Sequence, residues 1–155
     1  MRLLLTILFI FTFNTSAEEY PQGVAFSGEN KMTWWGFKIY DAKYYESNET
    51  NPKQLLELTY ARDIKVEQLI SSTRKEWKRL KLYDKKKSED WLTELSKIWP
   101  SVTNGTTLSI YIFNGKTYFF ENKKFKGMIS DAELSENLIE IWLHPKSRIK
   151  GLKTK

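Results

Sequence analysis

The stretch M-T-W-W-G-F-K-I-Y-D-A-K-Y-Y, Met32 to Tyr45, decides the fold that the sequence predicts. It holds six aromatic residues and is rich in side chains that suit a pleated, half-buried surface. The odd positions from Trp35 to Ile39 form one apolar face, and the even positions from Tyr40 to Tyr44 form the other. We expect one long central strand. Because a one-residue slip moves every side chain to the opposite face, this strand should carry a β-bulge near Ile39 and Tyr40, or be covered on both faces.

The N-terminal segment has the layout of a secretory signal peptide. Arg2 supplies a positive charge, an apolar run follows from Leu3 to Phe13, and small residues end at Ala17. The run is shorter than the roughly 20 residues that a spanning helix needs. We therefore expect residues 1–17 to be a signal peptide, with cleavage after Ala17 and a periplasmic or secreted location. An uncleaved membrane anchor is the alternative. Residues 18–155 then form a single domain with a basic C-terminal tail.

Composition and charge limit the partners of this domain. The chain has no Cys, so we expect a hydrophobic core rather than disulfides to hold it. The net charge is +6, and the tail Lys146 to Lys155 carries five basic residues and no acid. The rest of the chain is near neutral, which argues against a nucleic-acid surface. We expect a monomer with a solvated tail; weak contact of the tail with an anionic membrane surface is the functional alternative.

The remaining sequence predicts strands and helices without βαβ alternation. Alternation and turn residues predict short strands at Val24–Phe26, Leu56–Tyr60, Leu108–Ile112, Lys116–Glu121 and Phe125–Ile129. The dipeptide Asn114-Gly115 is a strong hairpin signal. Apolar residues at helical spacing predict three helices, capped by Asp63, Ser88 and Ser130. This order predicts an α+β domain, an antiparallel β-sheet with α-helices packed on one face.

The inventory of reactive residues predicts no catalytic residue, no metal site and no cofactor. His144 is the only histidine, and it precedes Pro145 at a predicted helix end, where it caps carbonyls or faces water. No Cys and no second His are present to share a metal. The seven glycines are scattered, so no phosphate-binding loop is formed.

Aromatic side chains offer the remaining candidate site. The candidate ligand-binding residues are Trp34, Tyr40, Tyr44, Arg62, Trp77, Tyr111 and Trp142. Their rings either fill a packed core or line a cleft with a few polar tips, which suits an apolar small molecule. Arg62 ends a strand just before the first long helix, so its guanidinium is either the partner of a ligand carboxylate or a surface charge.

Several segments, taken in order, resemble the signature blocks of bacterial chalcone isomerase-like proteins. They are Gly36–Tyr45, Leu56–Ile64, Trp99–Thr106 and Phe125–Leu134 with Ile141–Pro145, within residues 30–152. The resemblance implies the chalcone isomerase fold, an antiparallel sheet layered with helices. Some members of that fold close a flavanone ring and others bind fatty acids, while the secreted bacterial branch is largely without an assigned activity.

The resemblance also implies what a catalytic member needs: an Arg on an early strand and a Thr on the long strand, which polarise the substrate ketone. This chain has no Arg between Arg2 and Arg62, and Tyr40 is the nearest match to the Thr. We therefore expect a non-catalytic domain that binds an apolar or amphipathic small molecule such as a fatty acid. One alternative is an isomerase or lyase for a phenolic or enone substrate, with Tyr40 or Tyr111 as the acid. Another is an envelope protein-interaction module.

Overall fold

The computed structural model describes residues 19–153, so the predicted signal peptide and its cleavage point lie outside the described residues. The elements follow one another as β1 (Ala25–Trp34), β2 (Phe37–Glu46), β3 (Gln54–Tyr60), α1 (Val66–Arg79), α2 (Lys85–Ile98), β4 (Thr107–Phe113), β5 (Lys116–Glu121), β6 (Lys124–Ile129) and α3 (Ala132–Leu143). In this part of the chain, no helix has both the length and the apolar character that crossing a bilayer requires.

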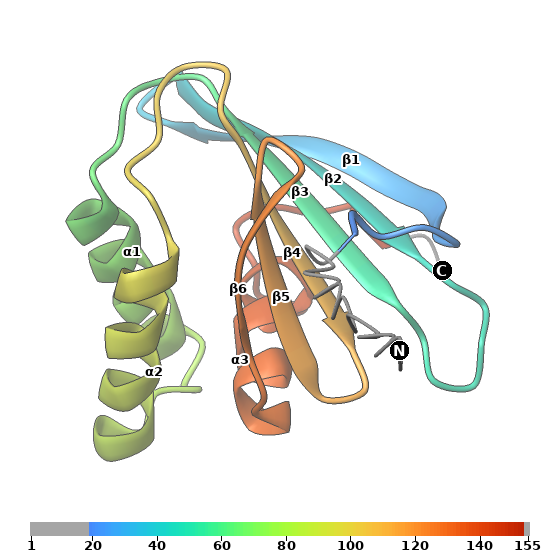
Figure 1. Cartoon of the computed structure of the whole chain (residues 1–155). Coiled ribbons are helices and arrows are strands. Elements are labelled where there is room, and N and C mark those ends of the chain that lie inside the picture. Colours follow the sequence, from blue (N-terminus) through green and yellow to red (C-terminus); the bar gives the residue numbers. More distant parts are fainter. Residues whose placement is uncertain (1–18, 154–155) are drawn as a thin grey trace, which may run out of the picture.

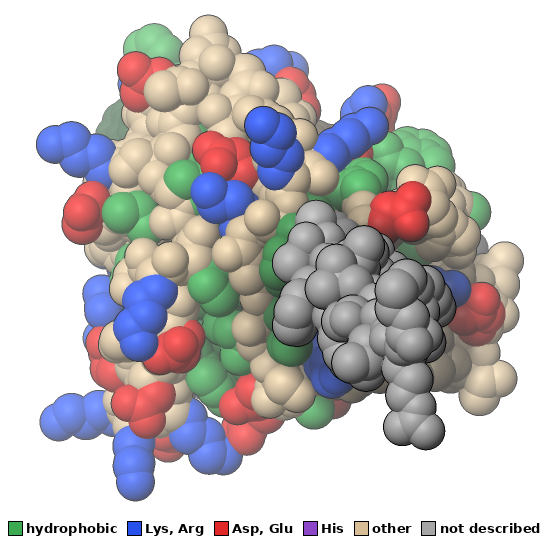
Figure 2. All heavy atoms as spheres, in the orientation of Figure 1, with side chains coloured by type: hydrophobic (Ala, Val, Ile, Leu, Met, Phe, Trp, Pro, Cys, Tyr) green, Lys and Arg blue, Asp and Glu red, His purple; other side chains and the backbone are tan. Residues whose placement is uncertain are grey.

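The six strands form one antiparallel sheet in the order β1-β2-β3-β4-β5-β6, so each strand pairs with its neighbour in sequence. Figure 1 shows a twisted sheet with the three helices on the same side of it. The prediction of an α+β domain with helices on one face of an antiparallel sheet is confirmed. The face seen in Figure 2 carries basic and acidic side chains interspersed, without one sign dominating.

The stretch Met32–Tyr45 is a hairpin rather than one central strand. Trp35 and Gly36 have φ angles of 52° and 80° and form the turn between β1 and β2, which lie at one edge of the sheet. The single-strand prediction was wrong because Trp is not a residue that marks a tight turn. Trp35 and Phe37, expected on an apolar face, are largely exposed at this turn, whereas Ala42 and Tyr44 are fully buried as expected.

The predicted bulge at Ile39 is confirmed by the strand register. Met32 pairs with Tyr40, and the next residue of β1, Thr33, pairs with Lys38. Ile39 is therefore the extra residue of β2, and the slip in the apolar alternation has a direct structural cause.

The hairpin predicted at Asn114-Gly115 is confirmed. Asn114 and Gly115 have φ angles of 52° and 67°, in the left-handed region that a two-residue hairpin turn requires. They join β4 to β5. Asn tolerates this conformation far better than most residues do, so local chemistry alone predicts the turn.

Each helix begins at a different residue from the one predicted. The Asp63 carboxylate accepts a hydrogen bond from a loop N–H and does not cap α1. Asp84 caps α2, one turn before the predicted Ser88, which lies buried inside the helix. Asp131, rather than Ser130, caps α3. The start of α2 was missed because three Lys residues fill its first turn, where the helix dipole disfavours positive charge.

The C-terminal segment was expected to be solvated, but up to residue 153 it lies against β1. Ile149 and Leu152 are buried in the hydrophobic core. The Asn30 side chain donates a 2.8 Å hydrogen bond to the Lys150 carbonyl. A side chain at Gly28 would clash with the backbone of this segment, which approaches within 2.3 Å of an added Cβ. Glycine is required there because two backbones meet.

Candidate functional site

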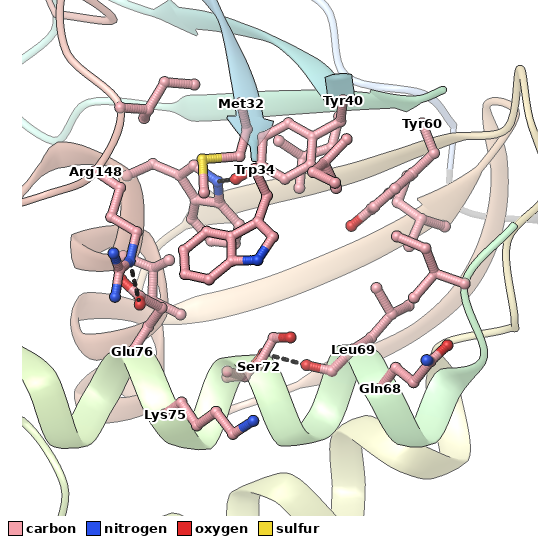
Figure 3. Close-up of a pocket in the computed structure, with 18 of the residues that line it drawn as sticks. Met32, Trp34, Tyr40, Tyr60, Gln68, Leu69, Ser72, Lys75, Glu76 and Arg148 are labelled. Atoms are coloured by element: carbon pink, nitrogen blue, oxygen red, sulfur yellow. Dashed lines mark hydrogen bonds and ion pairs between the residues drawn. The ribbon is translucent and has the colours of Figure 1, made fainter. Parts of the chain in front are cut away.

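A cavity of about 650 Å³ lies between the sheet and α1. Its apolar wall includes Met32, Leu58, Leu69, Leu108, Ile110 and Ile141, which come from strands of the sheet and from two helices. Figure 3 shows the cavity with α1 below it and the end of β1 above it. Exposed side chains of the β1 end, α1 and the C-terminal segment mark its mouth. The volume lies within the range of about 300–1,000 Å³ that is usual for small-molecule sites.

Two tyrosines supply polar groups inside this apolar space. The Tyr40 hydroxyl accepts a 3.0 Å hydrogen bond from the Trp142 indole N–H, and the Tyr40 and Tyr60 rings meet edge to face at 5.5 Å. Burial raises the pKa of Tyr40 to about 12, although the Trp142 bond opposes the shift. Burial also raises the pKa of Tyr60. Both hydroxyls therefore stay protonated at neutral pH and can donate a hydrogen bond.

The Tyr60 hydroxyl is a polar group of the cavity that the described residues leave free to bond to a ligand. Tyr60 is only 6% exposed, and its oxygen points into the cavity (Figure 3). Among residues 19–153 the hydroxyl has no hydrogen-bond partner, and Tyr60 meets Tyr40 through its ring alone. No fully buried side-chain nitrogen or oxygen among the described residues lacks a partner, so this hydroxyl opens onto the cavity, where a bound molecule can reach it. This hydroxyl is therefore suited to donating to an acceptor on a bound molecule.

The mouth of the cavity carries cations beside aromatic rings. The Arg62 guanidinium lies 5.9 Å from the centre of the Phe37 ring, and the Arg148 guanidinium lies 5.6 Å from that of Trp34. Lys75 of α1 lines the same mouth. A guanidinium can bind a carboxylate through two parallel hydrogen bonds, so the mouth is suited to an anionic head group.

Glu76 of α1 fixes the position of Arg148. Its carboxylate accepts a 2.8 Å hydrogen bond from Arg148, and Arg79 also donates to it. Burial alone would raise the pKa of Glu76, but the hydrogen bonds from Arg79 and Arg148 outweigh burial and lower it. Glu76 is therefore ionised at neutral pH, and it ties the C-terminal segment to α1 at the edge of the cavity.

Four of the seven sequence-predicted residues come together at this cavity: Trp34, Tyr40, Arg62 and Trp142. Tyr40 and Trp142 meet through their hydrogen bond, while Trp34 and Arg62 lie at the mouth. Whether these side chains bind a ligand stays a prediction.

Tyr44, Trp77 and Tyr111 lie away from the cavity. Tyr44 is fully buried, and its hydroxyl accepts a hydrogen bond from Gln54. Trp77 is also fully buried and donates a 2.8 Å hydrogen bond from its indole to the Asn137 carbonyl. Tyr111 lies on the face of the sheet opposite to the cavity-lining residues of β4. Its ring contacts neighbouring aromatic rings on that opposite face. The sequence alone could not show which of these residues fill the core and which line the cavity.

Sequence reasoning missed Tyr60, Glu76 and Arg148 as site residues. Tyr60 lies on the same face of β3 as Leu56 and Leu58. The alternation of the strand could therefore have shown that its hydroxyl faces the helices. Arg148 carried no such signal, because only tertiary contacts bring the tail to the cavity. Within residues 19–153, no group of three or more His, Asp or Glu side chains is arranged to hold a metal ion.

Comparison with known proteins gives structural similarity only. No protein-family model matches the chain, and no curated protein sequence matches it. The crystal structure of a fatty-acid binding protein of Arabidopsis thaliana matches with a TM-score of 0.68 and 9% sequence identity. The match covers 83% of this chain and 84% of that chain. At this identity the likeness concerns the fold alone. The chain thus has the chalcone isomerase-like α+β fold that the resemblance of its sequence blocks implied.

Proposed function

We propose that this protein is a non-catalytic binding protein for an amphipathic lipid such as a fatty acid, and that it works in the periplasm or outside the cell. The observation that carries the proposal is the cavity of about 650 Å³, apolar in its walls, with the Tyr60 hydroxyl inside, to which no residue from 19 to 153 forms a hydrogen bond. The Arabidopsis protein of the same fold is a fatty-acid binding protein, which adds support.

The chemistry of a fatty acid matches both parts of the site. Each buried methylene of an acyl chain contributes about 0.8 kcal/mol, and the apolar wall of the cavity offers that burial. A carboxylate only accepts hydrogen bonds, whereas the Tyr60 hydroxyl and the Arg62 guanidinium can both donate them. A neutral, wholly apolar molecule would leave the Tyr60 hydroxyl unpaired.

The isomerase alternative receives less support from the same residues. Tyr40, the nearest match to the catalytic Thr, has its hydroxyl oxygen occupied by the Trp142 indole and a pKa of about 12. An efficient general acid or base has a pKa near the working pH. Tyr40 therefore serves better as a fixed polar wall group than as a proton-transfer group.

Native mass spectrometry and thermal unfolding test the proposal together. The purified protein should carry a co-purified lipid or gain thermal stability when saturated fatty acids are added, because a ligand of the folded state stabilises it. Tyr60→Phe should weaken fatty-acid binding about tenfold, the usual cost of losing a hydrogen bond to a charged group. Its effect on the corresponding methyl ester should be smaller.

Tyr111→Phe is the matched control because Tyr111 lies on the opposite face of the sheet. It should leave fatty-acid binding unchanged. A lipid-free mass together with no thermal shift for any fatty acid of the series would overturn the proposal. Equal losses for Tyr60→Phe and Tyr111→Phe would overturn the assignment of the head-group site.

A further inference from the structure

The tip of the β1–β2 hairpin, residues Trp34, Trp35, Gly36 and Phe37, exposes three large aromatic side chains in sequence proximity. Their exposed fractions are 52% for Trp34, 85% for Trp35 and 66% for Phe37. Single exposed apolar residues are ordinary on protein surfaces, but a contiguous exposed group marks an interaction site. The hairpin tip is therefore a candidate docking surface.

Folding does not explain why Trp35 stands at this turn. Its φ of 52° lies in the left-handed region, which bulky residues rarely adopt. Asn114 has the same φ of 52° in the β4–β5 hairpin and belongs to the Asn-Gly pair that such turns favour. Trp35 stands where Asn would be less strained, and its ring is left in solvent.

Positive charge surrounds the hairpin tip. The Arg62 and Arg148 guanidiniums lie over the rings of Phe37 and Trp34. Lys31 and Lys38 lie on the hairpin itself. Nearby acids offset part of this charge, because Asp41 pairs with Lys38 and Glu76 pairs with Arg148. In the described part of the chain, Lys31, Arg62 and Lys75 have no ion-pair partner. The exposed Asp63 at the same mouth offsets one of these charges, so a net positive rim remains.

The hairpin tip and the mouth of the cavity share residues. Trp34 belongs to the tip and also lines the cavity, and Arg62 and Arg148 line the cavity while contacting the tip rings. Figure 3 shows the Trp34 indole beside the opening, between Arg148 and Tyr60. A surface that covered the tip would therefore lie directly against the mouth.

We propose that the hairpin tip docks on an anionic lipid bilayer, with the Trp35 ring in the interfacial region and Lys31 and Arg62 against the head groups. Indole rings favour the membrane–water interface because they combine an apolar body with a polar N–H. Basic side chains add attraction to anionic lipids. The inference rests on the proposed function in one respect: docking turns the mouth of a lipid-binding cavity toward the lipid.

Cosedimentation with vesicles tests the docking. Binding should be stronger to vesicles containing phosphatidylglycerol than to pure phosphatidylcholine vesicles, and it should weaken as salt is added. Trp35→Asn should lower the partition coefficient about tenfold, because one large aromatic side chain no longer leaves water. The same variant should unfold at an equal or higher temperature, because it creates the favoured Asn-Gly turn.

Phe26→Ala is the matched control, since Phe26 is an exposed aromatic residue at the other end of β1. It should leave vesicle binding unchanged, while Phe37→Ala weakens it. No binding to anionic vesicles, or equal binding by wild type and Trp35→Asn, would overturn the inference. So would a dimer that Trp35→Asn converts to a monomer, because a second copy of the chain would then cover the tip.

A fatty-acid thermal shift without vesicles separates this inference from the proposed function. Loss of vesicle binding with the thermal shift intact overturns the docking alone. Vesicle binding by protein that has a lipid-free native mass and shows no thermal shift overturns the lipid-binding cavity alone.

Discussion

The space between the sheet and the helices is filled at one end and open at the other. At the packed end, Trp77 and Trp91 meet edge to face at 5.8 Å, and Leu95 and Leu138 are fully buried around them. At the cavity end, the side chains of β2, β3 and α1 enclose a volume of about 650 Å³. Aromatic and aliphatic residues build both ends, so composition does not make the difference.

The placement of the helices explains the contrast. Helix α2 contacts β6 and α3 contacts β5, whereas α1 packs mainly on the other two helices. With α1 held away from β2 and β3, the side chains between them line a space that they do not fill. A helix that is carried by its neighbours, rather than by the sheet, therefore leaves room for a ligand.

The largest loss of folding stability should come from shortening a leucine, and the loss should differ between the two ends. Leu138→Ala at the packed end should cost about 2–5 kcal/mol, because it removes buried contacts and leaves a new hole. Leu58→Ala should cost less, since Leu58 already borders empty space. Urea unfolding of both variants measures the difference. Equal losses would contradict the distinction between the two ends.

Enlarging a side chain should lower the folding stability by a smaller amount, and again by less at the cavity end than at the packed end. Leu92→Phe, at the packed end, should destabilise by about 1–3 kcal/mol through overpacking. Ile110→Phe, on the cavity wall, should cost less than about 1 kcal/mol because the ring can enter the cavity. It should also weaken fatty-acid binding. Thermal unfolding with and without fatty acid checks both points, and a strongly destabilised Ile110→Phe would mean that the wall has no spare room.

The smallest change in folding stability that we expect comes from the charge of Glu76 at the rim of the cavity, and it depends on pH. The pKa of Glu76 is lowered in the folded protein, so its contribution is present above the unfolded pKa of about 4.3 and is lost as pH falls through the folded value. Glu76→Gln should therefore lower stability at pH 7, by no more than about 1 kcal/mol for such partly exposed pairs. The difference from wild type should shrink in acid.

Unfolding curves at a series of pH values measure this effect. Glu94→Gln is the control, because Glu94 forms an exposed pair with Lys97 on α2 and holds no second segment. A difference between wild type and Glu76→Gln that stays constant from neutral to acid pH would show that the Glu76 charge is not the stabilising feature.

The sequence predicted those parts of the fold that depend on local chemistry. Asn114-Gly115 carries the turn preference in its own residues, and the Ile39 bulge left its mark in the apolar alternation. Trp35-Gly36 is not a sequence that favours a turn, so the sequence predicted one strand where the structure has a hairpin.

The candidate site could be predicted only in part because it depends on long-range contacts. Tyr40 and Trp142 are 102 residues apart and meet through one hydrogen bond. Trp77 looked equally suitable in the sequence but fills the core. The distance of α1 from the sheet and the return of Arg148 to the rim follow from tertiary packing, which no local pattern encodes.

Ligand binding in the cavity can be followed by NMR through the indole N–H signals of isotope-labelled protein while a fatty acid is added. Trp142 and Trp34 line the cavity, whereas Trp77 and Trp91 belong to the packed end. Binding in the cavity predicts that the Trp142 and Trp34 signals move and that those of Trp77 and Trp91 stay in place. Signals that all remain still at saturating fatty acid, or a Trp77 signal that moves as far as that of Trp142, would contradict a ligand site at the open end.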